Sequence, residues 1–234
     1  MVKLTPNRLT LLRIFLLPLP CVLLFGGPEA KLTAVGIGSL LGLTDYLDGR
    51  LARREGPSRL GRLLDPVADK IFVSVIYLLL YHLTYLPYLP VFLLLLREIL
   101  IAGLRNLYPE GMRVWTLARI KTALQMLGAG GIVLAGSFLP HPWSSLLTQI
   151  IVWSVLILTW LSAWPYLREG FPALSRTPRR SLSLVFYLLP PLVLLLAFPY
   201  AGRFWLVILL ALPLLFLADL GLSFCSRPAK GLHS

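Results

Sequence analysis

Five of the ten acidic residues of this chain, four of them aspartates, lie between positions 45 and 69, in the stretch LTDYLDGRLARREGPSRLGRLLDPVADK. Asp45 and Asp48 are three residues apart, so a helix places both on one face. Asp65 and Asp69 are four apart, with the same consequence on a second helix. A Gly-Pro pair between them marks a turn, and Pro66 suits only a first helical turn. We therefore expect two antiparallel helices, each presenting two carboxylates at the same end.

Carboxylates that converge beside apolar segments repel one another, and each is costly to bury without compensation. Divalent cations provide that compensation. Mg²⁺ prefers oxygen ligands and often completes its coordination with waters and substrate phosphates. Two such ions, about 3.5–4 Å apart, suit a displacement at phosphorus. The acidic segment thus predicts a site for two Mg²⁺ ions, with Mn²⁺ as the alternative; an ordinary acidic and basic loop with incidental spacing is the competing interpretation.

Three neighbouring residues fit a phosphate-binding site. Gly49 lies beside Asp48, where it costs helix stability but lets a ligand approach the backbone closely. Gly61 lies four residues before Asp65 and likewise lets a ligand approach the backbone closely. Arg53 lies five residues beyond Asp48, and its planar guanidinium can bind a phosphate through two hydrogen bonds.

The composition indicates which solvent surrounds these residues. The chain has 234 residues, of which 57% are hydrophobic and 14% charged, whereas soluble domains are typically about 45–50% apolar and about 25% charged. The mean hydropathy is +0.80. The net charge of +12 is dispersed between apolar runs, which argues against nucleic-acid binding. We therefore predict a membrane protein.

Eight apolar segments are long enough, or nearly so, to cross a hydrocarbon core about 30 Å thick as helices. They are Leu9–Phe25, Leu32–Leu51, Val67–Leu83, Leu89–Leu107, Ala118–Phe138, Leu146–Tyr166, Leu182–Phe198 and Phe204–Phe224. With these spans, only Lys31 and Arg203 among the basic residues fall on one side of the bilayer. The positive-inside rule then places both termini and the acidic segment in the cytoplasm. We expect an all-α, multi-pass integral membrane protein, with a bacterial inner (plasma) membrane location.

The acidic segment resembles the signature of the CDP-alcohol phosphatidyltransferase family, D-x2-D-G-x2-A-R-x8-G-x3-D-x3-D. The matching residues are Asp45, Asp48, Gly49, Ala52, Arg53, Gly61, Asp65 and Asp69. One departure lies in the predicted turn, where seven residues rather than eight separate Arg53 from Gly61. This deletion should change the path of the loop more than the carboxylate geometry.

The resemblance implies both an architecture and residue roles. Residues 1–170 would form a six-helix catalytic core, residues 171–234 would add two transmembrane helices, and the chain would form a homodimer. Asp45, Asp48, Asp65 and Asp69 would ligate the metal ions, and Asp69 would also be the catalytic base that takes a proton from the attacking alcohol. The pocket for CDP-diacylglycerol, from which CMP leaves, would be lined by Gly49, Ala52, Arg53 and Gly61.

Four other stretches are similar to the branch of the family that makes phosphatidylglycerophosphate: PNRLTLLR, LLDPVADK, REILIAGLR and RIKTALQ. This likeness implies that glycerol 3-phosphate is the acceptor. A phosphate dianion needs a basic pocket, which would be formed by Arg97, Arg105, Arg119 and Lys121. Glu98 lies seven residues from Arg105, so a structural ion pair between them is the alternative. The branch usually has G-K-x-K-T where this chain has ARIKT, which keeps the charge but not the glycine.

Asn7 and Arg13 lie at the cytoplasmic end of the first predicted span. They are either contacts to the CDP-diacylglycerol headgroup or a helix start with a snorkelling arginine.

Rival functions stay open at this point. Another acceptor in the same family would give a synthase of cardiolipin, phosphatidylinositol phosphate or phosphatidylserine. A membrane cation transporter would use the aspartates as a permeation site, and a purely structural membrane protein would not need them.

Overall fold

The computed structural model describes residues 15–55, 61–107, 116–175 and 178–226. Within these ranges, only the backbone is described for some residues. These are residues 43–55, 61–67, 106–107, 116–120, 171, 173–175, 178–182 and 216–226.

The described part of the chain is helical and contains no strand. Its helices are α2 (Pro18–Leu23), α3 (Pro28–Glu55), α4 (Gly61–His82), α5 (Tyr88–Leu107), α6 (Thr116–Phe138), α7 (Trp143–Ser175), α8 (Pro178–Ala197) and α9 (Trp205–Ser226), with two short 3₁₀ turns, Phe198–Tyr200 and Gly202–Phe204, between the last two. Each helix overlaps one of the eight predicted apolar segments, although α2 takes up only six residues of Leu9–Phe25, of which residues 9–14 lie outside the described residues. The all-α prediction is therefore confirmed for the described residues.

Two helix boundaries differ from the prediction. Helix α4 begins at Gly61, so Pro66 is its sixth residue and does not lie in the first turn as expected. A proline this early removes a single backbone hydrogen bond, which the rest of a long helix can tolerate. Helix α7 continues to Ser175, beyond the predicted end at Tyr166, and passes through Pro165 and Pro172. The predicted domain boundary at residue 170 thus falls inside α7.

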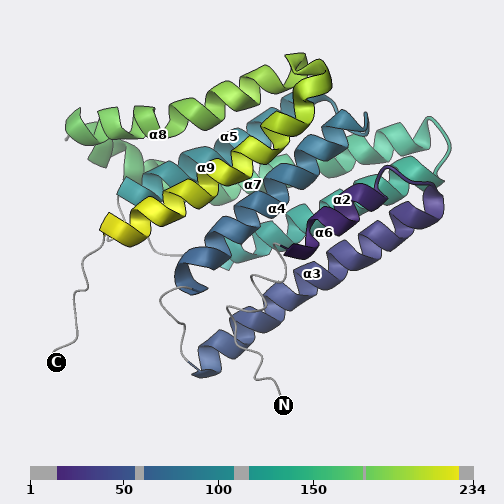
Figure 1. Ribbon diagram of the computed structural model, residues 1–234, viewed down its shortest axis with the longest axis horizontal. Helices are drawn as coiled ribbons and strands as arrows, with labels where there is room; N and C mark the ends of the chain where they lie inside the picture. Colours follow the sequence, from purple (N-terminus) through teal and green to yellow (C-terminus); the bar gives the residue numbers. More distant parts are fainter. Residues whose placement is uncertain (1–14, 56–60, 108–115, 176–177, 227–234) are drawn as a thin grey trace.

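Helix α4 lies at the centre of the bundle and packs against α5, α6 and α9. Helix α6 packs against α3 and, most extensively, against α7, while α8 packs against α5 and α9. Figure 1 shows the helices side by side, with α8 along one edge of the bundle and α3 along the opposite edge. The last two helices therefore cover α4 and α5 on the side away from α3.

The outer surface of the bundle is apolar. On α7, the side chains of Ile150, Ile157, Leu161 and Trp164 are each more than half exposed and share one helix face. Soluble proteins rarely expose apolar patches that extend along whole helices. Two helical stretches of the described residues, Trp143–Gly170 and Ser183–Tyr200, are long and apolar enough to cross a membrane. This arrangement is that of a membrane protein.

Helices α6 and α7 approach each other closely at Gly128. A Cβ atom added at this position would lie 2.7 Å from Cγ2 of Val155, which is buried on α7. Any larger residue therefore requires the Val155 side chain or one of the two helices to shift. By contrast, a Cβ atom at Gly36 on α3 would meet nothing within 4 Å.

We predict that Gly128→Ala destabilises the protein by about 1–3 kcal/mol, the usual cost of overpacking. The matched change Gly36→Ala should be neutral or stabilise by up to about 1 kcal/mol, because alanine favours helix over glycine. The measurement is the thermal unfolding midpoint of each variant in detergent. Equal midpoints for the two variants would contradict the close packing of α6 on α7.

Candidate active site

The four aspartates lie on the two helices expected to carry them. Asp45 and Asp48 lie in the second half of α3, and Asp65 and Asp69 lie in the first half of α4. The ends of these helices are six positions apart in the chain, so they lie within about 22 Å of each other. Figure 1 shows them at the same end of the bundle. The predicted placement on two consecutive helices is confirmed for the backbone.

The side chains of Asp45, Asp48 and Asp65 are outside the description, and that of Asp69 is partly buried. For this reason the described residues contain no group of three potential metal ligands. The chemistry of the donor set fits Mg²⁺ or Mn²⁺, since the segment offers four aspartate carboxylates and no Cys or His.

The predicted nucleotide pocket follows the same helices. Asp45, Asp48, Gly49 and Ala52 recur at helical spacing, so the observed helix α3 places them on one face. Gly61 is the first residue of α4. The side chains of Ala52 and Arg53 are outside the description, and Asn7 and Arg13 lie outside the described residues altogether. These assignments stay predictions.

A buried polar cluster joins α5, α6 and α7, and its centre is the carboxylate of Glu98, which is 6% exposed. Nζ of Lys121 donates to both carboxylate oxygens, at 2.6 and 2.8 Å. Nη1 of Arg97 and Nε2 of Gln125 donate to Oε1 at 3.2 and 3.1 Å. One carboxylate therefore accepts hydrogen bonds from three side chains on two helices.

Arg97 also connects α5 to α7 through hydrogen bonds. Its Nε donates to the backbone carbonyl of Thr159 at 3.1 Å, and its Nη2 donates to Oγ of Ser162 at 2.8 Å. The hydroxyl of Ser162 in turn donates to the carbonyl of Thr159 at 2.7 Å. Arg97 is only 3% exposed, so at least three of its N–H groups are directed at protein acceptors.

Lys121 connects this cluster to the acidic helices. It interacts electrostatically with Asp69 as well as with Glu98 and Arg97. Arg105 lies near Arg97, with its guanidinium carbon 5.2 Å from the centre of the Tyr166 ring. The structure thus brings two of the four predicted acceptor-binding residues, Arg97 and Lys121, together around Glu98, and Arg105 and Asp69 influence this pair electrostatically. The side chain of the fourth, Arg119 on α6, is outside the description.

The alternative pairing of Glu98 with Arg105 does not form: Glu98 binds Lys121 and Arg97 instead. Seven residues along a helix span about 10 Å, whereas Lys121 reaches Glu98 directly from the neighbouring helix. Sequence reasoning also missed the roles of Gln125, Thr159 and Ser162. The sequence does contain an indication of these roles: each is a polar residue inside an apolar span, and such a residue must find a hydrogen-bonding partner.

Comparisons with known proteins identify the family of the chain. A family model for CDP-alcohol phosphatidyltransferase matches residues 3–161. The chain therefore belongs to the CDP-alcohol phosphatidyltransferase family, as the acidic segment indicated.

Three relatives carry the same name, CDP-diacylglycerol–glycerol-3-phosphate 3-phosphatidyltransferase. The protein from Rickettsia bellii is 32% identical over 168 residues, which cover 70% of this chain and 93% of the relative. The Pseudomonas fluorescens protein is 34% identical, covering 76% of this chain and 96% of the relative. The Bacillus subtilis protein is 27% identical, covering 73% and 96%. These relatives place the chain in the branch predicted from its sequence.

We predict that Glu98→Gln destabilises the protein by about 3–5 kcal/mol, because it leaves the charges of Lys121 and Arg97 buried without a carboxylate. Adding Lys121→Met to this variant should recover part of the loss, since one of the uncompensated charges is then removed. Thermal unfolding of the single and double variants in detergent measures the coupling.

Glu29→Gln, at the exposed start of α3, is the control and should leave the unfolding midpoint unchanged. A double variant that is less stable than Glu98→Gln alone would show that Glu98 does not act through Lys121.

Proposed function

We propose that this protein transfers the phosphatidyl group of CDP-diacylglycerol to sn-glycerol 3-phosphate, giving phosphatidylglycerophosphate and CMP. This is a step of phospholipid biosynthesis. Support comes from the names of the relatives and from the eight signature residues on α3 and α4. The observation that carries the proposal is the family match over residues 3–161, which includes the acidic segment and the basic cluster of Arg97 and Lys121 around Glu98.

Asp45, Asp48, Asp65 and Asp69 would hold two Mg²⁺ ions, or Mn²⁺ in their place. When bound, these ions would stabilise negative charge on the pyrophosphate oxygens of CDP-diacylglycerol. Around them, the nucleotide and the lipid headgroup would be bound by Gly49, Ala52, Arg53, Gly61, Asn7 and Arg13.

In the reaction, Asp69 accepts the proton of the 1-hydroxyl of glycerol 3-phosphate. The hydroxyl oxygen forms a bond to the phosphorus that carries the diacylglycerol. The bond from this phosphorus to the bridging oxygen breaks, and CMP leaves with that oxygen. A positioned base of this kind contributes typically about 10²–10⁴-fold to a rate.

The acceptor phosphate would lie among Arg97, Arg105, Arg119 and Lys121. Within this set, Arg105 and Arg119 would supply the direct contacts, together with the third N–H of the Lys121 ammonium. Arg97 would support the pocket from behind, since its donors point to Glu98, Thr159 and Ser162. A phosphate dianion suits such a pocket, whereas serine carries no comparable charge.

The placement of the chain in the membrane completes the proposal. Its helices would cross a bacterial inner membrane several times, with the acidic segment on the cytoplasmic side, because nearly all Lys and Arg residues fall there. Residues 1–170 would form the catalytic core and residues 171–234 a C-terminal extension. The family likeness supports a homodimer as the working unit.

We predict that the purified protein releases CMP from CDP-diacylglycerol when glycerol 3-phosphate and Mg²⁺ are supplied, and that EDTA abolishes the release. Asp69→Asn should lower kcat by about 10²–10⁴-fold, the contribution of a general base. The exposed Glu29→Gln serves as the control with unchanged activity. CMP release with serine or phosphatidylglycerol, but none with glycerol 3-phosphate, would refute the choice of acceptor.

The acceptor pocket can be tested separately. Arg105→Ala should raise KM for glycerol 3-phosphate at least about tenfold, because it removes a charge-assisted hydrogen bond to the phosphate, while KM for CDP-diacylglycerol stays nearly constant. Arg203→Ala, which changes an exposed arginine between α8 and α9, is the matched control. An equal rise of both KM values in Arg105→Ala would argue against a role specific to the acceptor.

A further inference from the structure

Tyr166 lies in the last third of α7, next to two arginines of α5. Its side chain is buried, with 2% exposed. The guanidinium carbon of Arg105 lies 5.2 Å from the centre of the Tyr166 ring, which is within the range of a cation–π interaction. Tyr166 also interacts electrostatically with Arg97. One buried ring therefore neighbours two of the four residues that would surround the acceptor phosphate.

An apolar core joins α8 to α5 and α7 around this ring. Figure 1 shows α8 alongside α5, against which it packs. The buried members of this core are Ile101 and Leu104 of α5, Ala163 and Tyr166 of α7, and Leu184 of α8. Helix α8 thus contributes a buried side chain to the surroundings of the Tyr166 ring.

Helix α8 also approaches the backbone of α5 closely at Gly103. A Cβ atom added at Gly103 would lie 2.7 Å from Cδ1 of Leu184 and 2.9 Å from Cδ1 of Tyr187. Gly103 precedes Arg105 by two residues in the same helix. Because two side chains of α8 fill the space beside Gly103, a shift of α8 changes the packing of the segment that carries Arg105.

We propose that Tyr166 and helix α8 position Arg105 for the phosphate of the acceptor. The ring of Tyr166 holds the guanidinium, while Leu184 and Tyr187 fix the ring and the end of α5. An arginine side chain loses conformational entropy when a ligand immobilises it, and it loses less when it is already held in place. The inference deepens the proposed function and rests on it, because the phosphate is that of the acceptor.

The proposal gives the C-terminal part of the chain a share in substrate binding. Helix α8 lies beyond residues 3–161, which match the family model. Tyr166 and the residues of α8 are positioning residues, since they act through Arg105 and do not themselves touch the acceptor. Their loss should therefore change the affinity for the acceptor and leave that for CDP-diacylglycerol nearly constant.

The first test changes Tyr166. Tyr166→Leu should raise KM for glycerol 3-phosphate about three- to tenfold, which corresponds to the usual strength of a cation–π interaction. Tyr166→Phe keeps the ring and should retain most of the affinity for glycerol 3-phosphate. In Arg105→Ala, the further change Tyr166→Leu should raise this KM no more, because the ring then has no guanidinium to hold. Equal effects of the leucine and phenylalanine changes, or additive effects in the double variant, would overturn the inference.

Two buried leucines of α8 provide a matched pair for the second test. Leu184 and Leu195 are 6% and 1% exposed, and they lie eleven residues apart, about 16 Å along the helix. Both changes to alanine should lower the unfolding midpoint in detergent, since each leaves a cavity. Leu184→Ala should also raise KM for glycerol 3-phosphate about threefold, as a weakened cation–π interaction would, whereas Leu195→Ala should not. The same KM in both variants would overturn the role of α8.

A binding measurement separates this inference from the proposed function, because it needs no turnover. Calorimetric titration with glycerol 3-phosphate and Mg²⁺, in the absence of CDP-diacylglycerol, should show binding to the unmodified protein and to Tyr166→Phe. Tyr166→Leu should bind about three- to tenfold more weakly. This pattern without CMP release by the unmodified protein would refute the proposed reaction alone. Equal affinities of the three proteins, or no binding to the unmodified protein, would overturn the inference.

Discussion

The ion pair between Glu98 and Lys121 is the interaction on which the interior of this bundle depends. Both groups lie among apolar helices, where a charge without a partner is very costly. Glu98 compensates Lys121 and Arg97 together, and Gln125, Thr159 and Ser162 satisfy most of the remaining hydrogen-bonding groups. A polar centre that is satisfied in this way can lie inside a membrane protein and still present charge to a neighbouring site, here to Asp69.

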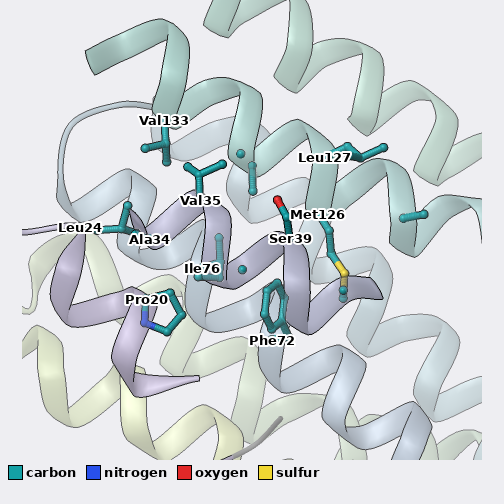
Figure 2. A pocket seen from close by; sticks show the side chains of 15 residues that line it. Pro20, Leu24, Ala34, Val35, Ser39, Phe72, Ile76, Met126, Leu127 and Val133 are labelled. Carbon is teal, nitrogen blue, oxygen red and sulfur yellow. The ribbon is translucent and has the colours of Figure 1, made fainter. Parts of the chain in front are cut away.

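The central helix α4 divides the bundle into two sides with different surroundings. On one side it borders an apolar groove of about 360 Å³ between α3 and α6 (Figure 2). On the other side it packs against α9, where His82 stacks on Trp205 with the ring centres 3.9 Å apart. Tyr88 of α5 donates a hydrogen bond to the carbonyl of Leu195 on α8. The two C-terminal helices lie beyond the residues that match the family model, and they bury faces of α4 and α5 that would otherwise contact lipid.

The sequence correctly predicted the features of the fold that depend on local periodicity and composition. Helices overlap all eight apolar segments, and the acidic pairs fell on α3 and α4, because apolar length and helical spacing are properties of short windows. The start of α4 ahead of Pro66 was missed, since helix ends depend on a few weak interactions. The partner of Glu98 was missed as well: Lys121 is distant in the chain, and helix packing alone brings it near. The groove depends on small residues of α3 and α6, among them Gly38 and Gly130, which face each other in a way that no single segment reveals.

The central claim is that the carboxylates of α3 and α4 converge on metal ions beside Lys121. Anomalous diffraction from crystals grown with Mn²⁺ and CDP-diacylglycerol tests it most directly. The account predicts Mn²⁺ peaks ligated by Asp45, Asp48, Asp65 and Asp69, with the pyrophosphate bound to the same ions and Lys121 next to Asp69. Peaks elsewhere in the molecule, or aspartate side chains that point away from one another, would contradict it.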